Sequence, residues 1–154
     1  MSPKKVRIDR ITKHRERQFN DQAAVLQRSR AEHEAAEARA RQEEERLREA
    51  VERRNALASE TVSVAEWIEA ESWVGQRARG AATAVRELNQ AQAGLEEAQE
   101  HLKEAHVALK AMELVGQRLA AAELRREETL ERREQDELTN ARGATGSRGR
   151  GGRP

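Results

Sequence analysis

The sequence lacks cysteine and tyrosine, and its 154 residues include only two prolines, one phenylalanine and two tryptophans. Without cysteine the chain can form neither a disulfide nor a thiolate metal site, which fits a reducing compartment. Pro3 and Pro154 leave the whole stretch between them free of helix-breaking proline. No run approaches the ~20 apolar residues that cross a bilayer, and no apolar segment of a secretory signal follows the basic start. We therefore expect a soluble cytoplasmic protein.

The residues that are abundant favour helix. Charged residues make up 37% and apolar residues 36% of the chain, and most of the apolar ones are alanine. Ala, Leu, Glu, Arg and Gln lose little freedom in a helix, and so alanine-rich a set does not build an ordinary globular core. This composition is typical of a coiled coil or long helix. The net charge of +1 hides a segregation: residues 1–20 carry +5 and residues 141–154 carry +4, which leaves −8 for the rest.

The second half of the chain has a regular heptad pattern. One row of leucines and a neighbouring row made mostly of alanine each recur every seven residues. This alternation of four and three predicts a coiled-coil seam over residues 84–119, interrupted only by Gly116. The core positions are Leu88, Leu95, Leu102 and Leu109 on one row, and Ala84, Ala91, Ala98, Ala105, Met112 and Leu119 on the other.

The first half is helical but its apolar pattern is weaker. The best four-three track begins at Ile8 and ends at Leu57, and about half of its positions are polar. Each leucine replaced by a polar group gives up about 1.5–3 kcal/mol of burial. We expect this helix to be loosely held when the protein is alone. The polar positions on the track are Thr12, Arg15, Gln22, Ser29, His33, Glu43 and Arg54.

A break is predicted between the halves. Ser63 and Glu66 match a capping box, and the β-branched Thr61, Val62 and Val64 disfavour continuous helix. The expected fold is all-α: a long antiparallel two-helix coiled-coil hairpin, with a new helix starting near Val64 and carrying both tryptophans. A single rod that dimerises in parallel is the alternative architecture. The expected segments are a disordered start (1–4), a first helix (5–60), a bend region with a short Trp-containing helix (61–80), a second helix (81–140) and a disordered Gly/Arg tail (141–154).

Catalytic and metal sites are not expected. His101 and His106 are five residues apart and do not share a helical face, and His14 and His33 belong to no ligand motif. The many carboxylates lie on a pattern that predicts solvated helix faces, whereas acid–base catalysis needs a pocket that shifts their pKa. No phosphate-binding loop is present. The interpretation is therefore a non-enzymatic protein without cofactor or small-molecule substrate.

The two tryptophans are candidates for a partner contact. Trp67 and Trp73 lie 600° apart on a helix, or 240° net, so they cannot both face one seam. At least one should be exposed, and an exposed indole on so polar a protein indicates an interface anchor. Packing on the opposite helix is the alternative. The tail sequence RGRGGR resembles RNA-binding Arg-Gly segments but has no aromatic residue.

Three stretches together resemble the FliJ/YscO proteins of bacterial type III secretion. The start KVRIDRITKHRERQFNDQAAVLQ looks like the Arg-rich opening helix of YscO-type members, WIEAESWV is similar to a flagellar W-I-x-x-x-x-F-I segment, and RREQDEL at 132–138 resembles the charged family ending. The resemblance implies an antiparallel coiled coil similar to the γ subunit of rotary ATPases. Its termini would enter the pore of the hexameric secretion ATPase, and its bend would point to the cytoplasmic domain of the export gate; some members also bind secretion chaperones.

On this resemblance, expected site residues can be assigned to each end. Trp73 matches a gate-contacting aromatic position, whereas Arg77, Gly80 and Ala84 differ from the flagellar Leu, Ala and His, which favours an injectisome member. The two terminal segments are expected to lie side by side. The expected gate contacts are Trp67, Ile68, Trp73 and Val74, and the expected ATPase-ring contacts are Arg7, Arg10, Lys13, Arg15, Arg17, Arg132, Glu134, Asp136 and Glu137.

Two rival functions follow from the same residues. A generic homodimeric coiled-coil scaffold would need only the heptad pattern. A nucleic-acid-binding helical protein would use the basic ends, and its binding would depend on salt. The expected role is the stalk, located in the cytoplasm at the base of the secretion apparatus, with no insertion into the membrane.

Overall fold

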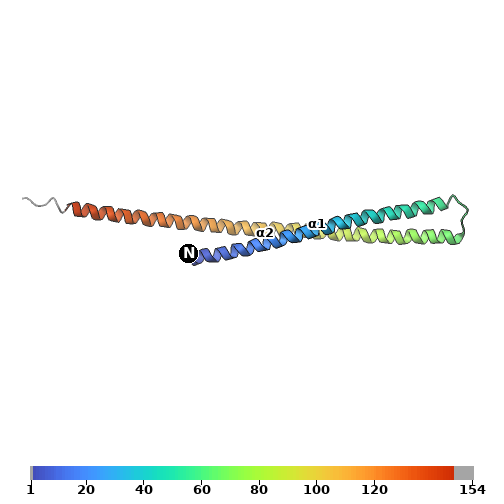
Figure 1. Ribbon diagram of the computed structural model, residues 1–154, viewed down its shortest axis with the longest axis horizontal. Helices are drawn as coiled ribbons and strands as arrows, with labels where there is room; N and C mark the ends of the chain where they lie inside the picture. The colour runs from blue at the N-terminus through green and yellow to red at the C-terminus, as the bar shows by residue number, and fades with distance from the viewer. Residues whose placement is uncertain (1, 148–154) are drawn as a thin grey trace, which may run out of the picture. The chain divides into compact units, whose positions relative to one another are not determined.

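The computed structural model describes residues 2–147, and these form two long helices joined by a short connection (Figure 1). Helix α1 covers Pro3–Leu57 and helix α2 covers Val64–Ser147. The described residues contain no strand. The all-α prediction is therefore confirmed.

Helix α1 begins where its first residues dictate. Pro3 occupies the first helical position, where the missing amide hydrogen costs nothing, and the residue before a proline disfavours helix. Ser2 caps the helix, because its Oγ accepts a hydrogen bond from the Lys5 amide at 3.3 Å. The helix thus starts earlier than the expected residue 5.

The connection between the helices is set by the predicted capping box. The Glu66 amide donates to Ser63 Oγ at 3.2 Å, and the Ser63 amide donates to Glu66 Oε2 at 3.3 Å. These reciprocal bonds satisfy two amide donors at the start of α2. The helix then continues without a break through Gly75 and Gly80. The bend is therefore confined to residues 58–63, and residues 64–80, expected in a bend region, belong to α2.

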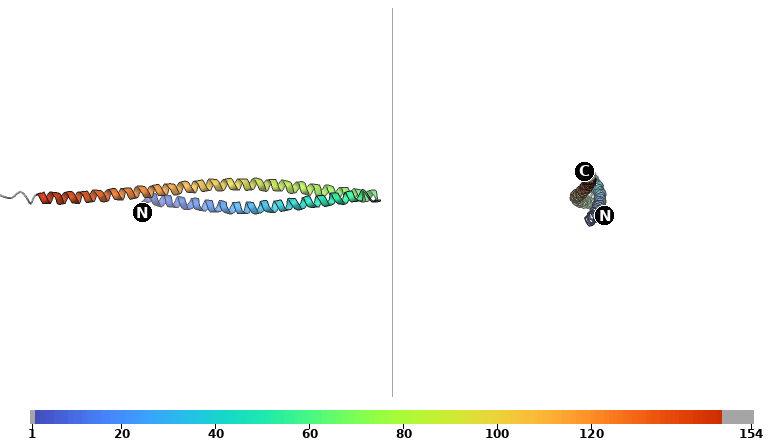
Figure 2. Two further views of the ribbon diagram at one scale, coloured as in Figure 1. Left: turned by 90° about the horizontal axis from the view of Figure 1, so that it is seen from above. Right: turned by 90° about the vertical axis from the view of Figure 1, so that its left-hand side faces the viewer.

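Residues 16–107 form one compact unit, in which α1 and α2 run antiparallel (Figures 1 and 2). The Phe19 ring lies 5.8 Å from the His106 ring, and Arg54 Nη1 lies 3.5 Å from Glu71 Oε1. Between these ends, Arg39 Nη1 lies 3.6 Å from Glu87 Oε2. Residue numbers fall on α2 as they rise on α1, which establishes the hairpin and excludes a single uninterrupted rod in this part of the chain.

The seam of this unit follows the four-three pattern of both helices. On α2 the buried and half-buried positions begin at Trp67 and include Ala84 and Ala98, which are 5% and 3% exposed. On α1 every position of the track within the unit is buried or half-buried, including the polar ones. The core is thin, because only Leu26, Ala36, Ala50, Ala84 and Ala98 fall into the buried class here.

Residues 1–15 and 108–154 form the second unit, of which residues 2–15 and 108–147 are described. Ser2 Oγ donates to Glu123 Oε1 at 2.8 Å, and a Cβ added at Gly116 would contact Ile8 Cγ2 at 3.7 Å. These pairs show that the start of α1 lies antiparallel to α2 and ends opposite Glu123. Leu109 is the buried residue of this seam, at 8% exposure.

Helix α2 continues well past the residue that faces the start of α1. All described side chains from Leu124 to Gly146 are exposed. The predicted end of this helix was residue 140, and the structure extends it to Ser147. The rest of the predicted Gly/Arg tail, 148–154, lies outside the described residues.

Candidate functional site

The described residues offer surfaces rather than a catalytic pocket. In the part of the chain that the structure covers, no group of three or more His, Asp and Glu side chains could hold a metal ion. None of the described helices combines the length and the hydropathy of a membrane span. The hollows along the hairpin are open grooves between two helices, so the candidate site is a set of contact surfaces.

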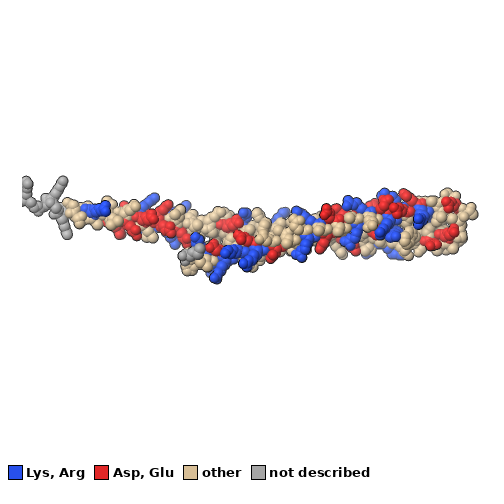
Figure 3. Space-filling model, in the orientation of Figure 1, with Lys and Arg blue, Asp and Glu red and all other residues tan. Residues whose placement is uncertain are grey.

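The first surface is the cationic face at the start of α1 (Figure 3). Arg7, Arg10 and Lys13 are exposed, and so is Arg17 on the next turn. Arg15 differs, because it lies on the seam track and is half-buried. Arg7, Arg10, Lys13 and Arg17 lie within about ten residues and so project along one short stretch of helix, at 1.5 Å rise per residue. This stretch can attract an acidic surface, and the attraction would weaken with salt.

The second surface is the end of α2. Arg132, Glu134, Asp136 and Glu137 are all exposed, as the charge pattern predicts. They do not lie beside the cationic face, however, because Ser2 already lies opposite Glu123. The expectation that the two terminal segments lie side by side is wrong. The physical reason is the register: Ser2 lies opposite Glu123 and Ile8 lies opposite Gly116, so the described start of α1 runs away from residues 132–137.

The third surface surrounds the tryptophans. Trp67 is half-buried on the seam, whereas Trp73 is 42% exposed. The Arg77 guanidinium lies 4.4 Å from the centre of a Trp73 ring, a cation–π contact of about 0.5–1 kcal/mol at an exposed site. Of the two aliphatic residues assigned to the gate, Ile68 is 61% exposed and Val74 is half-buried. Trp73 and Ile68 are therefore the members of the predicted set that a partner can reach.

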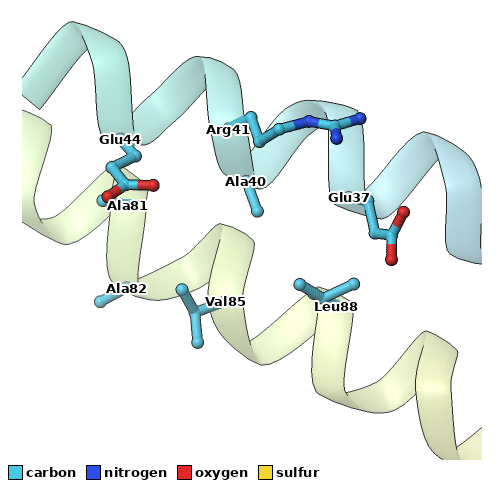
Figure 4. A pocket seen from close by; sticks show the side chains of 8 residues that line it. All are labelled: Glu37, Ala40, Arg41, Glu44, Ala81, Ala82, Val85 and Leu88. Carbon is cyan, nitrogen blue, oxygen red and sulfur yellow. The ribbon is translucent and has the colours of Figure 1, made fainter.

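A shallow apolar groove lies between α1 and α2 further along the hairpin (Figure 4). Its apolar lining comes from Ala40 on α1 and from Ala81, Ala82, Val85 and Leu88 on α2, while Glu37, Arg41 and Glu44 form its polar edge on α1. Val85 is 50% exposed. The sequence analysis did not single out this groove. A signal was available, because Ala82 and Val85 continue an apolar row beside the seam.

The predicted core positions of α2 lie where the heptad pattern places them. Ala84, Ala98 and Leu109 are buried, and the other assigned core residues are half-buried. The half-buried ones are Leu88, Ala91, Leu95, Leu102, Ala105, Met112 and Leu119.

The comparison with protein families identifies the chain. The family model described as Flagellar FliJ protein matches residues 4–147. The chain belongs to the FliJ family. The match covers both helices and the connection between them, so it is not limited to one coiled-coil segment. No curated protein and no solved structure matches the chain. The FliJ protein described here is thus associated with flagellar or type III protein export, a family role that is not catalytic.

Proposed function

We propose that this FliJ protein is the central stalk of a type III secretion ATPase complex and links the hexameric ATPase ring to the export gate. The observation that carries the proposal is the family match over 4–147, combined with exposed charged residues near the start of α1 and the end of α2 and an exposed tryptophan near the connection between the helices. The cationic face at the start of α1 and the charged end of α2 serve the ring. Trp73 and Ile68, near the bend, serve the gate.

The dimensions and the chemistry of the helices support this role. A helix with its side chains is 10–12 Å across, so a pair is roughly 20 Å across and suits a narrow channel. Exposed arginine and lysine side chains meet acidic surfaces with modest energies, about 0–1 kcal/mol per pair. Such contacts let a stalk meet successive ring subunits without being held in one orientation.

The ring contact is tested by reversing charge on the cationic face. In the triple variant Arg10→Glu, Lys13→Glu and Arg17→Glu, we expect stimulation of the cognate ATPase to fall at least fivefold at low salt, because attraction becomes repulsion. The matched control reverses three exposed arginines elsewhere on α1, Arg28, Arg30 and Arg41, and should keep stimulation within twofold. Unchanged stimulation and pull-down by the first triple variant would remove the cationic face from the ring contact.

The proposed contact with the export gate is tested by replacing Trp73. Trp73→Ala should weaken binding to the cytoplasmic domain of the gate at least tenfold, since buried tryptophans dominate interface energies. Val115→Ala is the control, because Val115 is 43% exposed, almost the same as Trp73, and lies outside the bend half of α2. Equal affinities for the two variants would show that the gate does not bind at Trp73.

A further inference from the structure

Helix α2 carries a second four-three row that α1 does not cover. The row begins at the first residue of the helix, and apolar or small side chains occupy every position except Glu71. Val64, Ile68 and Val85 on this row are 76%, 61% and 50% exposed. A row with this spacing is a coiled-coil seam in its own right. Its members, here called the second row, are Val64, Ile68, Glu71, Gly75, Ala78, Ala82 and Val85.

The apolar character of the second row is confined to the half of α2 near the bend. Beyond Val85 the same spacing meets only polar residues: Asn89, Gln92, Glu96, Gln99 and Lys103. The corresponding row on the other side of the seam is also mostly polar: Glu66, Glu69, Trp73, Gln76, Gly80, Thr83 and Glu87. The second row is therefore a bounded patch and not a general feature of an alanine-rich helix.

Gly75, at the centre of the second row, has no role within the hairpin. A Cβ added there would meet nothing within 4 Å, whereas a Cβ added at Gly80 would meet Glu43 Oε2 at 3.0 Å. Glycine inside a helix is destabilising relative to alanine. Gly94 is equally free of contacts, so Gly75 does not require a partner, but it allows another backbone to approach closely at the centre of the second row.

We propose that the second row binds a second copy of this chain, in an antiparallel dimer whose two-fold axis passes at Gly75. In this register Ile68 of each copy packs on Ala82 of the other, so that large side chains meet small ones. Val64 then reaches the groove that contains Ala82 and Val85 (Figure 4). The two glycines meet at the axis, where the helices are closest. Such a two-fold interface requires a self-complementary surface.

The charges of the second row fit the same register. Glu71 lies in the layer of Ala78 of the second copy, where the small alanine leaves room, and Arg79 follows directly. Symmetry supplies this Glu71–Arg79 pair twice. Within the described residues Arg79 forms no ion pair, and Glu71 uses only Oε1, at 3.5 Å from Arg54, with the Glu71 side chain 46% exposed. In an antiparallel pair of helices, the same side of each row lies together. Arg79 therefore lies next to Ser72 of the second copy and not next to another arginine.

The size of the patch sets the strength of the dimer. The second row spans six helical turns, and its side chains are mostly small, so the dimer buries roughly 1,000 Å² or less, at the low end of specific interfaces. Association is then micromolar and reversible. The dimer covers the exposed apolar row of the free protein, which would otherwise attract unrelated surfaces. The dimer covers Ile68, which the stalk proposal assigns to the gate, so binding of the gate at Ile68 would require the dimer to dissociate.

Sedimentation equilibrium of the full chain from about 1 µM to 1 mM measures the dimer directly. The wild type should shift from monomer to dimer across this range. Ala82→Glu should weaken association at least thirtyfold, because it puts a carboxylate against Ile68. Ala111→Glu, the same change at an exposed alanine on neither row, should have no effect. A wild type that is monomeric at 1 mM, or an Ala82→Glu variant that dimerises as the wild type does, overturns the proposal.

Charge exchange tests the register. Glu71→Arg and Arg79→Glu should each weaken the dimer about tenfold, and the double variant should return to within threefold of the wild type. A double variant as weak as either single variant contradicts the pairing. Helix content by circular dichroism separates loss of association from loss of folding.

Cross-linking tests the axis, because the chain has no other cysteine. Under mild oxidation Gly75→Cys should give a covalent dimer in most of the protein. Gly94→Cys is the matched control, since a Cβ there also meets nothing within 4 Å, and should stay monomeric. Equal cross-linking at positions 75 and 94 would contradict the placement of the two-fold axis at Gly75. If the wild type stays monomeric and Ala82→Glu no longer binds the cytoplasmic domain of the gate, the second row is a contact surface for the gate and the dimer proposal is wrong.

Discussion

The two helices share one seam but contribute to it very differently. Helix α2 supplies apolar or small residues at nearly every seam position, with Arg77 as an exception, whereas about half of the positions on α1 are polar. The polar groups of α1 mostly find partners on their own helix: Thr12 Oγ1 donates to the Ile8 carbonyl at 2.9 Å, and Arg46 Nη1 lies 2.8 Å from Glu43 Oε1. The polar seam residues of α1 therefore do not block the pairing, and Arg54 contributes to it through its contact with Glu71.

The largest effect should come from the α2 side of the seam. Leu109→Ala should lower the free energy of unfolding by about 2–4 kcal/mol, because it removes a buried leucine. Leu124→Ala, at a leucine that is 57% exposed, is the control and should change stability by less than about 0.5 kcal/mol. Chemical denaturation measures both. Equal losses would show that the seam does not hold the helices together.

The start of α2 should be the next most sensitive point. Ser63→Ala removes the side chain that accepts from the Glu66 amide and should cost about 1 kcal/mol. Ser59→Ala is a control in the same connection, because Ser59 Oγ bonds only the Ala56 carbonyl. Thermal unfolding should separate the two variants. A control that loses as much as Ser63→Ala would argue against the capping box.

A polar seam residue of α1 can be replaced by leucine, the residue type found on the α2 side of the seam. Gln22→Leu should raise the free energy of unfolding by about 1 kcal/mol, since it adds apolar burial at a half-buried seam position. Gln27→Leu, at an exposed position on the same helix, should leave stability within about 0.5 kcal/mol. If neither change stabilises the protein, the polar seam positions of α1 do not limit its stability.

The smallest effects concern glycines of α2. Gly94→Ala should stabilise the protein by about 0.5–1 kcal/mol, because alanine favours helix and its Cβ meets nothing. Gly80→Ala should gain less, since its Cβ would lie 3.0 Å from Glu43 Oε2. Melting temperatures of the two variants give the order. A larger gain at Gly80 would mean that Glu43 moves aside freely.

Much of the fold could be predicted from particular residues. The heptad rows of α2 and the capping box at Ser63 and Glu66 act locally, so the pattern alone located the seam of α2 and the start of this helix. Helix geometry predicted that at least one tryptophan is exposed, and the structure shows that it is Trp73, because Trp67 occupies the seam.

Other features needed the structure because they depend on the pairing of the helices. The register of the two helices decides which residues lie opposite one another. Ser2 lies opposite Glu123, so the part of α2 after Glu123 does not face the described start of α1. The pairing also separates the covered row of α2 from the second row. In the sequence both rows consist mostly of apolar or small residues, and only the position of α1 shows which row is left open.

The central claim is that α1 pairs with α2 in one antiparallel register that the α2 seam sets. A short bis-maleimide cross-linker tests it in the Ile8→Cys, Gly116→Cys double variant, because the added Cβ at Gly116 would contact Ile8. We expect rapid intramolecular cross-linking at low concentration, and none when Gly143→Cys, in the same unit and with nothing within 4 Å of its Cβ, replaces Gly116→Cys. Equal cross-linking of both pairs, or cross-links only between molecules, would contradict it.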